Sequence, residues 1–176
     1  LGNDSGVYNL GFENINNKNK TAEGWSIGTP GSGYKVKIDS IEKHSVRYSL
    51  LIEKVDKEIK SLYDLSTYII PAQYEGKEIE IKFFLKLENV HEKADFMLRI
   101  DGDNPDQLQL VRLLSSRVHG TQKWREYKIK LPLPAEASKI FLSPILYGVG
   151  KLWIDDIQVR IDGRAISKAK LKQKHD

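Results

Sequence analysis

Residues 151–161 read KLWIDDIQVRI, and this stretch decides how the rest of the chain is interpreted. A strand sends alternate side chains to opposite faces. The side chains that share one parity here are Trp153, Asp155, Ile157 and Val159. The alternation therefore predicts a strand whose inward face includes a carboxylate, and a buried carboxylate is costly unless it is paired or binds a metal.

Other segments alternate between apolar and polar residues in the same way, with turn residues between them. They are Tyr34–Ile38, Val46–Glu53, Glu78–Glu88, Asp95–Asp101 and Trp124–Leu131. Residue types common in strands extend the prediction to Val7–Phe12, Gly24–Ile27, Ser66–Ile70, Gln107–Leu114 and Lys139–Tyr147. Residues 54–65 fit either a helix or a long connection. About ten short strands without alternating long helices predict an all-β, antiparallel two-sheet β-sandwich with its chain ends side by side.

The charge distribution divides the chain into a nearly neutral body and a basic end. Residues 161–176 contain five cations and two anions, a net charge of +3, so residues 1–160 carry +1 of the total of +4. A neutral body argues against nucleic-acid binding, which usually needs a basic face. We therefore predict a sandwich domain over residues 1–160 and a basic tail or linker over 161–176, of which Ala165–Lys174 is able to form a short helix.

Several classes of function lack the residues they need. The absence of cysteine excludes disulfides, thiolate catalysis and cysteine–zinc sites. No apolar run approaches the ~20 residues of a membrane span. The four histidines have no metal-ligand spacing, no Gly-x-Ser-x-Gly motif occurs, and GTPGSG at 28–33 lacks the lysine of a phosphate loop. Glu88 and Asp101 are the one carboxylate pair considered for glycoside hydrolysis, and we predict that the chain is not an enzyme.

Four stretches resemble jelly-roll carbohydrate-binding modules of bacterial secreted enzymes: NLGFE at 9–13, GW at 24–25, KHSVRYSL at 43–50 and WIDDI at 153–157. A closer resemblance is to accessory jelly-roll domains that lie beside bacterial hydrolases and regulators. The matching stretches are LENV at 87–90, RIDG at 99–102, GTQKWREY at 120–127 and GVGKLWIDD at 148–156. The resemblance covers residues 7–160 and implies a galactose-binding-like jelly roll.

The resemblance also implies a structural calcium ion. Modules of this kind often hold one ion between the N-terminal Gly-x-Glu, the closing aspartate and backbone carbonyls of an intervening turn. Carried over, the ligands are the Gly11 carbonyl, Glu13, the carbonyl of Lys43 or Ser45, and Asp155 or Asp156. Ca²⁺ accepts such mixtures of carboxylate and carbonyl oxygens. The alternative is that Lys43 or Arg47 pairs with these carboxylates and no metal binds.

A ligand face is predicted on the side of the strands that points away from the core. Its candidates by parity are Phe84, Met97, Arg99 and Asp101. The resemblance adds Arg117, because the related domains carry an arginine just before the Gly-Thr turn, and Tyr147 would add an aromatic wall. Arg99 offers a bidentate fork and Asp101 an acceptor for hydroxyl groups. The alternative is a salt bridge from Arg99 to Asp101 or Glu88 on a solvated face. We expect the three tryptophans, at positions 25, 124 and 153, to pack in the core.

These observations favour a non-catalytic, carbohydrate-binding-like module that binds an oligo- or polysaccharide through its concave sheet. The alternative is a structural spacer or protein-interaction domain of a larger bacterial protein, and a hydrolase is the third hypothesis. The resemblance implies a fused catalytic domain as partner and an extracellular, periplasmic or cell-surface location. We expect a monomer that binds no nucleic acid.

Overall fold

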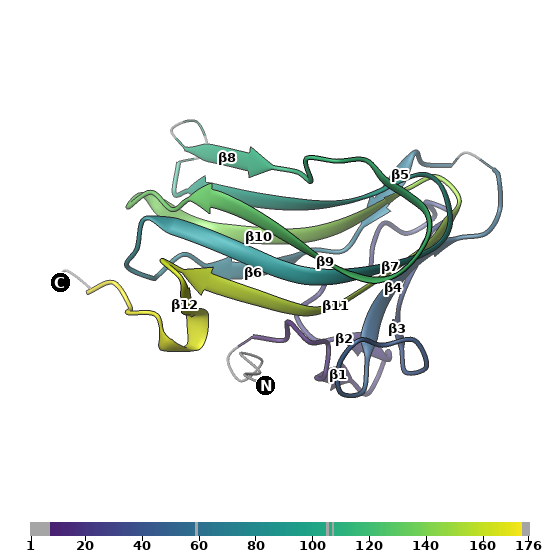
Figure 1. The fold of residues 1–176 in the computed structure, drawn as a ribbon, viewed down its shortest axis with the longest axis horizontal. Coiled ribbons are helices and arrows are strands. Elements are labelled where there is room, and N and C mark those ends of the chain that lie inside the picture. Colours follow the sequence, from purple (N-terminus) through teal and green to yellow (C-terminus); the bar gives the residue numbers. More distant parts are fainter. Residues whose placement is uncertain (1–7, 59, 105, 107, 174–176) are drawn as a thin grey trace.

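The computed structural model describes residues 8–58, 60–104, 106 and 108–173, and it is built almost wholly from β-strands (Figure 1). The strands are β1 (Ile15–Asn16), β2 (Thr21–Ala22), β3 (Lys35–Asp39), β4 (Ser49–Lys54), β5 (Tyr63–Leu65), β6 (Tyr68–Pro71), β7 (Glu78–Gly102), β8 (Gln109–Arg112), β9 (Val118–Pro132), β10 (Ala137–Tyr147), β11 (Gly150–Ile161) and β12 (Arg164–Ala165). One 3₁₀ turn, η2, spans Ile166–Lys168. The all-β prediction is confirmed.

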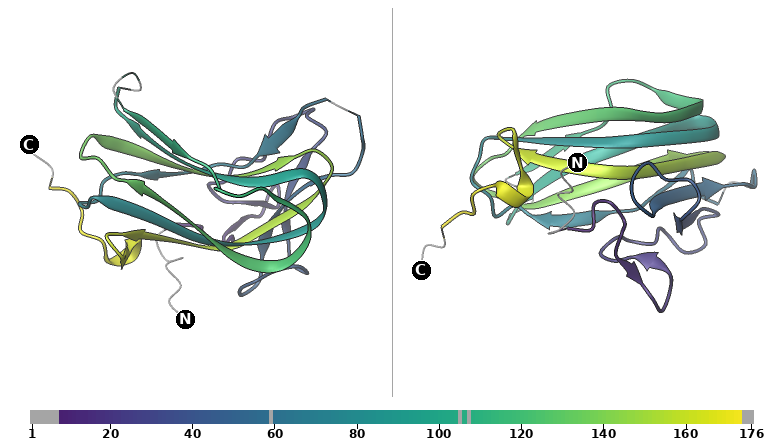
Figure 2. Two further views of the ribbon diagram at one scale, coloured as in Figure 1. Left: turned by 45° about the horizontal axis from the view of Figure 1, so that its top comes forward. Right: turned by 60° about the horizontal axis from the view of Figure 1, so that its bottom comes forward.

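Strand β7 is an interior strand of both layers of the sandwich. Residues 78–88 lie between β11 and β9, with β4 and β3 beyond β11; we call this layer the first sheet. Residues 93–102 lie between β10 and β8, with β5 and β6 beyond β10; this layer is the second sheet. Every pairing is antiparallel, and the β1–β2 hairpin (purple in Figure 2) stands outside both sheets.

The sequence predicts two strands where the structure has the single strand β7. The residues between them, 89–94, belong to the same strand, while the pairing with β9 shifts register around Val90. Asn89 and Gly120 take positive φ angles of 49° and 79° at this point. Irregularities of this kind bend a strand and increase its twist. The bend carries β7 from one layer into the other.

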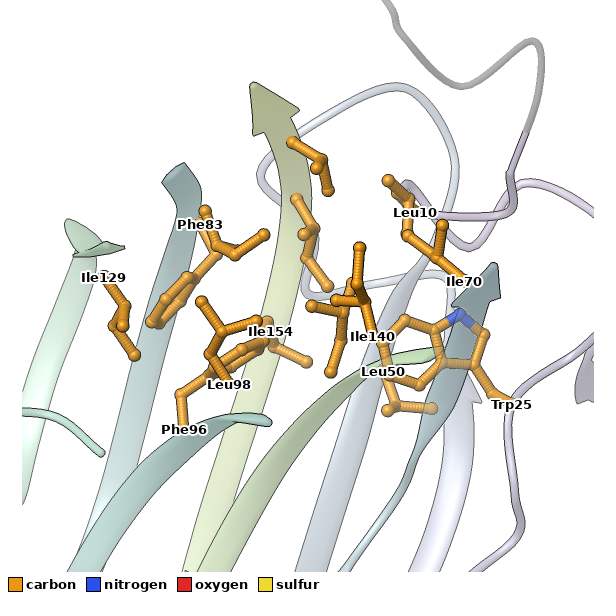
Figure 3. Packing of buried hydrophobic residues seen from close by; sticks show 14 of the residues in the cluster. Leu10, Trp25, Leu50, Ile70, Phe83, Phe96, Leu98, Ile129, Ile140 and Ile154 are labelled. Atoms are coloured by element: carbon orange, nitrogen blue, oxygen red, sulfur yellow. The ribbon is translucent and has the colours of Figure 1, made fainter. Parts of the chain in front are cut away.

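The core lies between the two sheets and is filled by their inward-facing residues (Figure 3). Phe83 of the first sheet and Phe96 of the second are fully buried and stack with ring centroids 4.2 Å apart. Each fully buried residue of this size contributes about 1.5–3 kcal/mol of hydrophobic stabilisation. The stack therefore joins the two halves of β7 across the interior.

The N-terminal segment is wrongly predicted as strands, although its apolar residues do reach the core. Residues 8–12 and 24–27 form no strand, and Val7 lies outside the described residues. Asn9 organises this segment: its side-chain amide donates to the carbonyls of Asn14 and Glu23 and accepts from the Asn14 N–H. Trp25 is buried in the core, as predicted, and its indole N–H donates to the Asn9 carbonyl.

The closing strand β11 contains a bulge that changes which side chains face inward. Its pairing with β7 shifts between Asp155 and Gln158, and Asp156 has a φ of 52°. The core residues are therefore Leu152 and Ile154 before the bulge and Ile157, Val159 and Ile161 after it. The single parity predicted for this strand is wrong because a bulge exchanges the two faces. Trp153 and Asp155 face away from the core.

The segment after β11 packs against the sandwich instead of leaving it as a linker. Residues 164–165 pair with β11, Ile166 is buried, and Leu171 forms a β-bridge with Tyr74. The Lys172 N–H donates to the Gln73 carbonyl at 2.7 Å. Helical structure here is limited to the turn η2, shorter than the helix that was expected. The packed unit thus extends past residue 160 to Lys172. Among the described residues, none belongs to a helix long and apolar enough to cross a bilayer.

Candidate functional site

The outer face of the second sheet, here called the second-sheet face, combines aromatic and charged side chains. Alternate residues of β7 and β10 belong to the core, so their neighbours in the chain point away from it. The outward residues that matter here are Lys93, Asp95, Met97, Arg99 and Asp101 on β7, Phe141 and Tyr147 on β10, and Tyr63 on β5. The centre of this face is covered in part, because the Leu114 N–H donates to Asp95 and the hydroxyl groups of Thr67 and Ser143 are hydrogen-bonded. The rings of Phe141 and Tyr147 toward its two ends are half-buried.

Arg99 is held flat at one end of this face. Its Nε and Nη2 donate to the two carboxylate oxygens of Asp101 at 2.8 and 2.6 Å, which is a bidentate pair. The guanidinium carbon lies 5.1 Å from the ring centroid of Phe141. The hydrogen bonds from Arg99 lower the pKa of Asp101. Both oxygens of Asp101 are thus in use, whereas Arg99 keeps three of its five N–H donors for another partner.

A second aromatic group lies at the other end. The rings of Tyr147 and Tyr63 are 5.2 Å apart, and the Lys93 ammonium lies 4.5 Å above the Tyr147 ring. Lys93 also pairs with Asp95 at 3.2 Å. Phe141 and Tyr147 are six residues apart on one strand, so about 20 Å separates them. The half-buried Met97 lies between them, opposite Ser143 on β10. The result is an elongated strip with a ring at each end.

Two of the predicted ligand residues lie elsewhere. Phe84 points outward from the first sheet and stacks on His44, with ring centroids 3.7 Å apart. Arg117 donates from Nε and Nη2 to the Glu92 carbonyl at 3.2 and 2.9 Å. The structure therefore brings Met97, Arg99, Asp101 and Tyr147 together and separates Phe84 from them. The prediction for Phe84 is wrong because the bend in β7 places its two halves in different layers.

The predicted calcium residues meet at the loop of residues 40–48, which connects β3 to β4. The chain ends do lie side by side, since the Ile157 N–H donates to the Leu10 carbonyl at 3.2 Å. Glu13 accepts hydrogen bonds from the backbone N–H groups of Arg47 and Tyr48 and from the Arg47 Nε at 3.0 Å. The alternative in which Arg47 pairs with a carboxylate is therefore the arrangement observed at Glu13.

Asp155 is fully buried and serves a different part of the same loop. Its oxygens accept the backbone N–H groups of His44 and Ser45, the Ser45 hydroxyl and the backbone N–H of Asp156. Burial raises the pKa of Asp155 to about 6, although these N–H donors favour the charged form. Asp156 lies 3.7 Å from the Nδ1 of His44, and the Lys43 ammonium donates to the Ser40 carbonyl.

These contacts test whether the residues fit calcium. The ion needs six to eight oxygen ligands, but the oxygens of Glu13 and Asp155 face N–H and O–H donors. Within the described ranges, no three histidine or acidic side chains gather where they could hold a metal. As arranged, the Gly11, Glu13, Lys43, Ser45, Asp155 and Asp156 set does not fit calcium. The carboxylates instead fasten the chain ends to the 40–48 loop, and the test of the calcium expectation is whether added Ca²⁺ raises the melting temperature.

The 40–48 loop covers the outer face of the first sheet. Trp153 is 3% exposed although it lies outside the core, and its indole N–H donates to Asp39 at 2.9 Å. The Glu42 carboxylate pairs with Lys86, whose ammonium lies 5.3 Å from the Trp153 ring centroid. Trp124 is half-buried beside His44. The prediction that all three tryptophans pack in the core is correct for Trp25 alone.

The carboxylates considered for hydrolysis do not form a catalytic pair. Glu88 points outward from the first sheet and pairs with Lys151 at 3.2 Å. Asp101 points outward from the second sheet and pairs with Arg99. Because the two lie on opposite outer faces, they cannot flank one glycosidic bond.

The chain was compared with known proteins by sequence and by structure. No family model and no curated protein matches it, but solved structures do. One is the CBM22-1 xylan-binding domain of Paenibacillus barcinonensis Xyn10C, at a TM-score of 0.58 and 16% identity, covering 94% of each chain. Another is the family 61 module TmCBM61, solved with β-1,4-galactotriose, at 0.57 and 15%, covering 88% of this chain and 97% of that one.

The fold is that of a jelly-roll carbohydrate-binding module. The same fold occurs within the enzymatically active domain of bacteriophage CBA120 tailspike protein 4, at a TM-score of 0.63 and 15% identity; the match covers 88% of this chain and 21% of that one. The chain therefore spans about a fifth of the tailspike chain that it matches. At these identities the likeness establishes the fold, and the ligand has to be argued from the residues of the site.

Within this module fold, sequence reasoning missed the two rings that flank the strip. Phe141 was not selected because residues 139–147 are apolar on both parities, which gives no sign of an outward face. Tyr63 falls in a segment predicted as either helix or connection. A signal for Phe141 was present in the register, since it lies directly opposite Arg99, but register follows from strand order, which one sequence does not supply.

Proposed function

We propose that this chain is a non-catalytic module that binds an oligo- or polysaccharide through the second-sheet face, taken as the concave face of the sandwich. The observation that carries the proposal is the strip with Phe141 and Arg99 at one end and Tyr147 and Tyr63 at the other. The coarser similarity to carbohydrate-binding modules supports it.

The chemistry of a sugar suits this strip. A pyranose ring presents an apolar face of C–H groups, which packs on an aromatic side chain, and a rim of hydroxyl groups, which hydrogen-bond to planar polar side chains. Tyr147 offers such a ring, and Arg99 offers fixed N–H donors that are already oriented by Asp101. Because Arg99 is held before binding, little side-chain freedom is lost when a hydroxyl group docks on it.

The proposal includes a binding role without catalysis. The carboxylates of the second-sheet face are engaged by cations, Asp101 by Arg99 and Asp95 by Lys93. A general acid needs a raised pKa, whereas the pKa of Asp101 is lowered. We therefore propose a binding role without turnover. Fusion to a catalytic domain is also proposed, because one structural neighbour was solved as a CBM22-1–GH10 pair. Secretion and a monomeric state belong to the same proposal.

The test is binding to a glycan array, followed by affinity measurements with the strongest ligand. The double variant Phe141→Ala, Tyr147→Ala should lose at least tenfold in affinity, because each ring is an aromatic anchor. Phe84→Ala is the matched control, since it removes an aromatic side chain from the opposite outer face. The control should bind as the unsubstituted protein does. An equal loss in both variants contradicts the assignment of the face.

The alternative function is that of a spacer or protein-interaction domain. It is favoured by the exposed apolar side chains of the 40–48 loop, Ile41 and Val46, which are 84% and 60% exposed. An array without signal, together with a stable complex between this domain and a neighbouring domain of the parent protein, supports this alternative. Ile41→Ser with Val46→Ser should then weaken the complex.

A further inference from the structure

A cleft of about 380 Å³ opens at one end of the sandwich, beside the second-sheet face. We call it the end cleft. It lies where β4 ends, next to the bend of β7 and the turn from β10 to β11. The described residues that line it are Lys54, Lys57, Ser61, Leu62, His91, Glu92, Tyr147, Gly148 and Val149.

The unusual residue of this cleft is Lys54, which is 4% exposed. It is the last residue of β4 and points to the same side as the core residues Leu50 and Ile52. Its ammonium donates to the Ser61 carbonyl at 3.3 Å and lies 4.8 Å from the ring centroid of Tyr34. In the part of the chain that the structure describes, no carboxylate forms an ion pair with it.

The buried ammonium of Lys54 has N–H donors without a hydrogen-bond acceptor among the described residues. The group carries three N–H donors, and one long hydrogen bond occupies one of them. Burial of a cation is costly unless an anion or several acceptors compensate it. Tyr34 cannot supply more than its ring face, because its hydroxyl group already donates to the Leu62 carbonyl and accepts the Gly148 N–H. An anion entering the cleft would complete the environment of Lys54.

The charged side chains that line the cleft carry a net positive charge. Lys54 and Lys57 face a single lining carboxylate, that of Glu92, so the lining carries +1 with His91 neutral. The aliphatic part of Glu92 packs against Gly148, where a Cβ would come within 2.3 Å of its Cγ. Lys57 is exposed at the rim and adds attraction for an approaching anion.

The end cleft and the second-sheet face share Tyr147. Its ring contacts Tyr63 and Lys93 on the strip, and the same residue lines the cleft. A sugar packed on Tyr147 would therefore lie at the rim of the cleft that Lys54 also lines. Resting on the proposed function, we propose that the end cleft binds the anionic substituent, a carboxylate or a sulfate, of an acidic sugar in the bound glycan. A uronate is the form tested first, because its carboxylate supplies the anion that a buried ammonium needs as a partner.

The experiment uses paired glycans: each uronate-containing oligosaccharide of an array is printed beside its carboxyl-reduced counterpart and beside the 6-sulfated form of that counterpart. The best pair is then measured by calorimetry at two salt concentrations. At least one uronate glycan should bind tenfold or more tightly than its reduced counterpart, and the difference should shrink as salt rises. Tighter binding of the sulfated form assigns the cleft to sulfate instead of carboxylate.

The variant Lys54→Met keeps the aliphatic stem and removes the charge. It should abolish the preference for the acidic glycan and leave the affinity for the reduced counterpart unchanged. Lys128→Met, an exposed lysine of β9 on the first sheet, is the matched control and should keep the preference. If Lys54→Met does not fold, by circular dichroism and thermal unfolding, Lys54→Gln takes its place.

The outcomes separate this inference from the function on which it rests. Equal affinity for acidic and reduced members of every pair overturns the role of the cleft, while binding of the reduced glycans leaves the proposed function standing. A preference that survives in Lys54→Met and Lys54→Gln also overturns it. An array on which no glycan binds overturns both proposals.

Discussion

The two outer faces of this sandwich are both built from strands of alternating residues, yet the aromatic residues on them are covered to different degrees. On the first sheet, the 40–48 loop lies over Trp153, which is 3% exposed and hydrogen-bonded to Asp39. On the second sheet, Phe141 and Tyr147 keep part of their rings in solvent. The comparison teaches that an outward aromatic residue is a candidate for binding only after the loops that cover it are known.

The largest expected effect is on stability at the outer face of the first sheet. Trp153→Ala should destabilise the fold by about 3–5 kcal/mol, the usual range for removing a buried tryptophan. Urea unfolding of this variant and of Phe141→Ala measures the contrast, and Phe141→Ala should cost less than about 1.5 kcal/mol because it is half-buried. Equal losses at the two positions contradict the distinction between the faces.

A pH effect of about 3 kcal/mol is expected from Asp155. Its pKa of about 6 in the fold lies above the value of about 3.9 in the unfolded chain. The folded state then binds more protons between pH 4 and 6, so this group's contribution to stability is largest below pH 4 and falls as pH rises through 6. The measurement is the difference in unfolding free energy between the unsubstituted protein and Asp155→Asn from pH 4 to 7.

That difference removes the contributions of the other carboxylates, which are common to both proteins. Asp155→Asn should flatten the pH dependence and also lose part of the hydrogen bonding to the 40–48 loop, because an amide replaces one acceptor oxygen by a donor. If the pH dependence of the two proteins is parallel, Asp155 does not titrate in this range.

A smaller pH effect is expected from Asp101 on the second-sheet face, where stability falls as pH is lowered. Asp101 has a lowered pKa because Arg99 bonds to it, so its stabilising contribution is present above the unfolded pKa and is lost as pH falls below about 4. Arg99→Ala should cost about 1–2 kcal/mol by leaving the Asp101 carboxylate without its partner, and Arg99→Lys should recover part of this. Thermal unfolding at pH 7 and pH 3 checks both. A variant whose loss is the same at both pH values speaks against the pair.

The smallest expected effect is that of calcium. Because Glu13 and Asp155 already accept N–H and O–H donors, adding CaCl₂ should leave the melting temperature unchanged, whereas saturation of a real site would raise it. Arg47→Ala removes the side-chain donor from one carboxylate oxygen of Glu13, so a weak calcium site is most readily detected in this variant. A rise in melting temperature that EGTA reverses, in the unsubstituted protein, would establish the calcium ion that the family resemblance implies.

Residue periodicity predicted most of the strands, because strands with one wet face alternate reliably; β3, the first half of β7, β9 and β11 are found close to where they were expected. It failed where local geometry overrides alternation. The bulge at Asp156 exchanged the faces of β11, and the side chain of Asn9 replaced strand pairing near the N-terminus. The bulge depends on pairing with a strand that is distant in the sequence, and the Asn9 side chain bonds to residues 5 and 14 positions away. An alternating pattern within one segment contains neither kind of contact.

The candidate site, like the strands, was predicted in part from the sequence. Arg99, Asp101 and Met97 were identified from their parity and Tyr147 as an added aromatic residue, and the structure brings them onto one face. Phe141 and Lys54 were not identified, because each looks like an ordinary member of a strand until its burial and its cross-strand neighbours are known. A lysine at the end of an alternating strand is typically solvated, and only the fold shows that Lys54 turns inward.

Because β7 is an interior strand of both layers, the two layers share one strand. A fluctuation that frees residues 78–88 from β9 and β11 also loosens the strand on which β8 and β10 are paired. Amide hydrogen exchange should therefore report one cooperative opening for the centres of both sheets, with similar protection at Phe83 and Phe96. The two layers are therefore expected to open together at their shared strand, whereas the edge strands β3 and β8 are free to open separately.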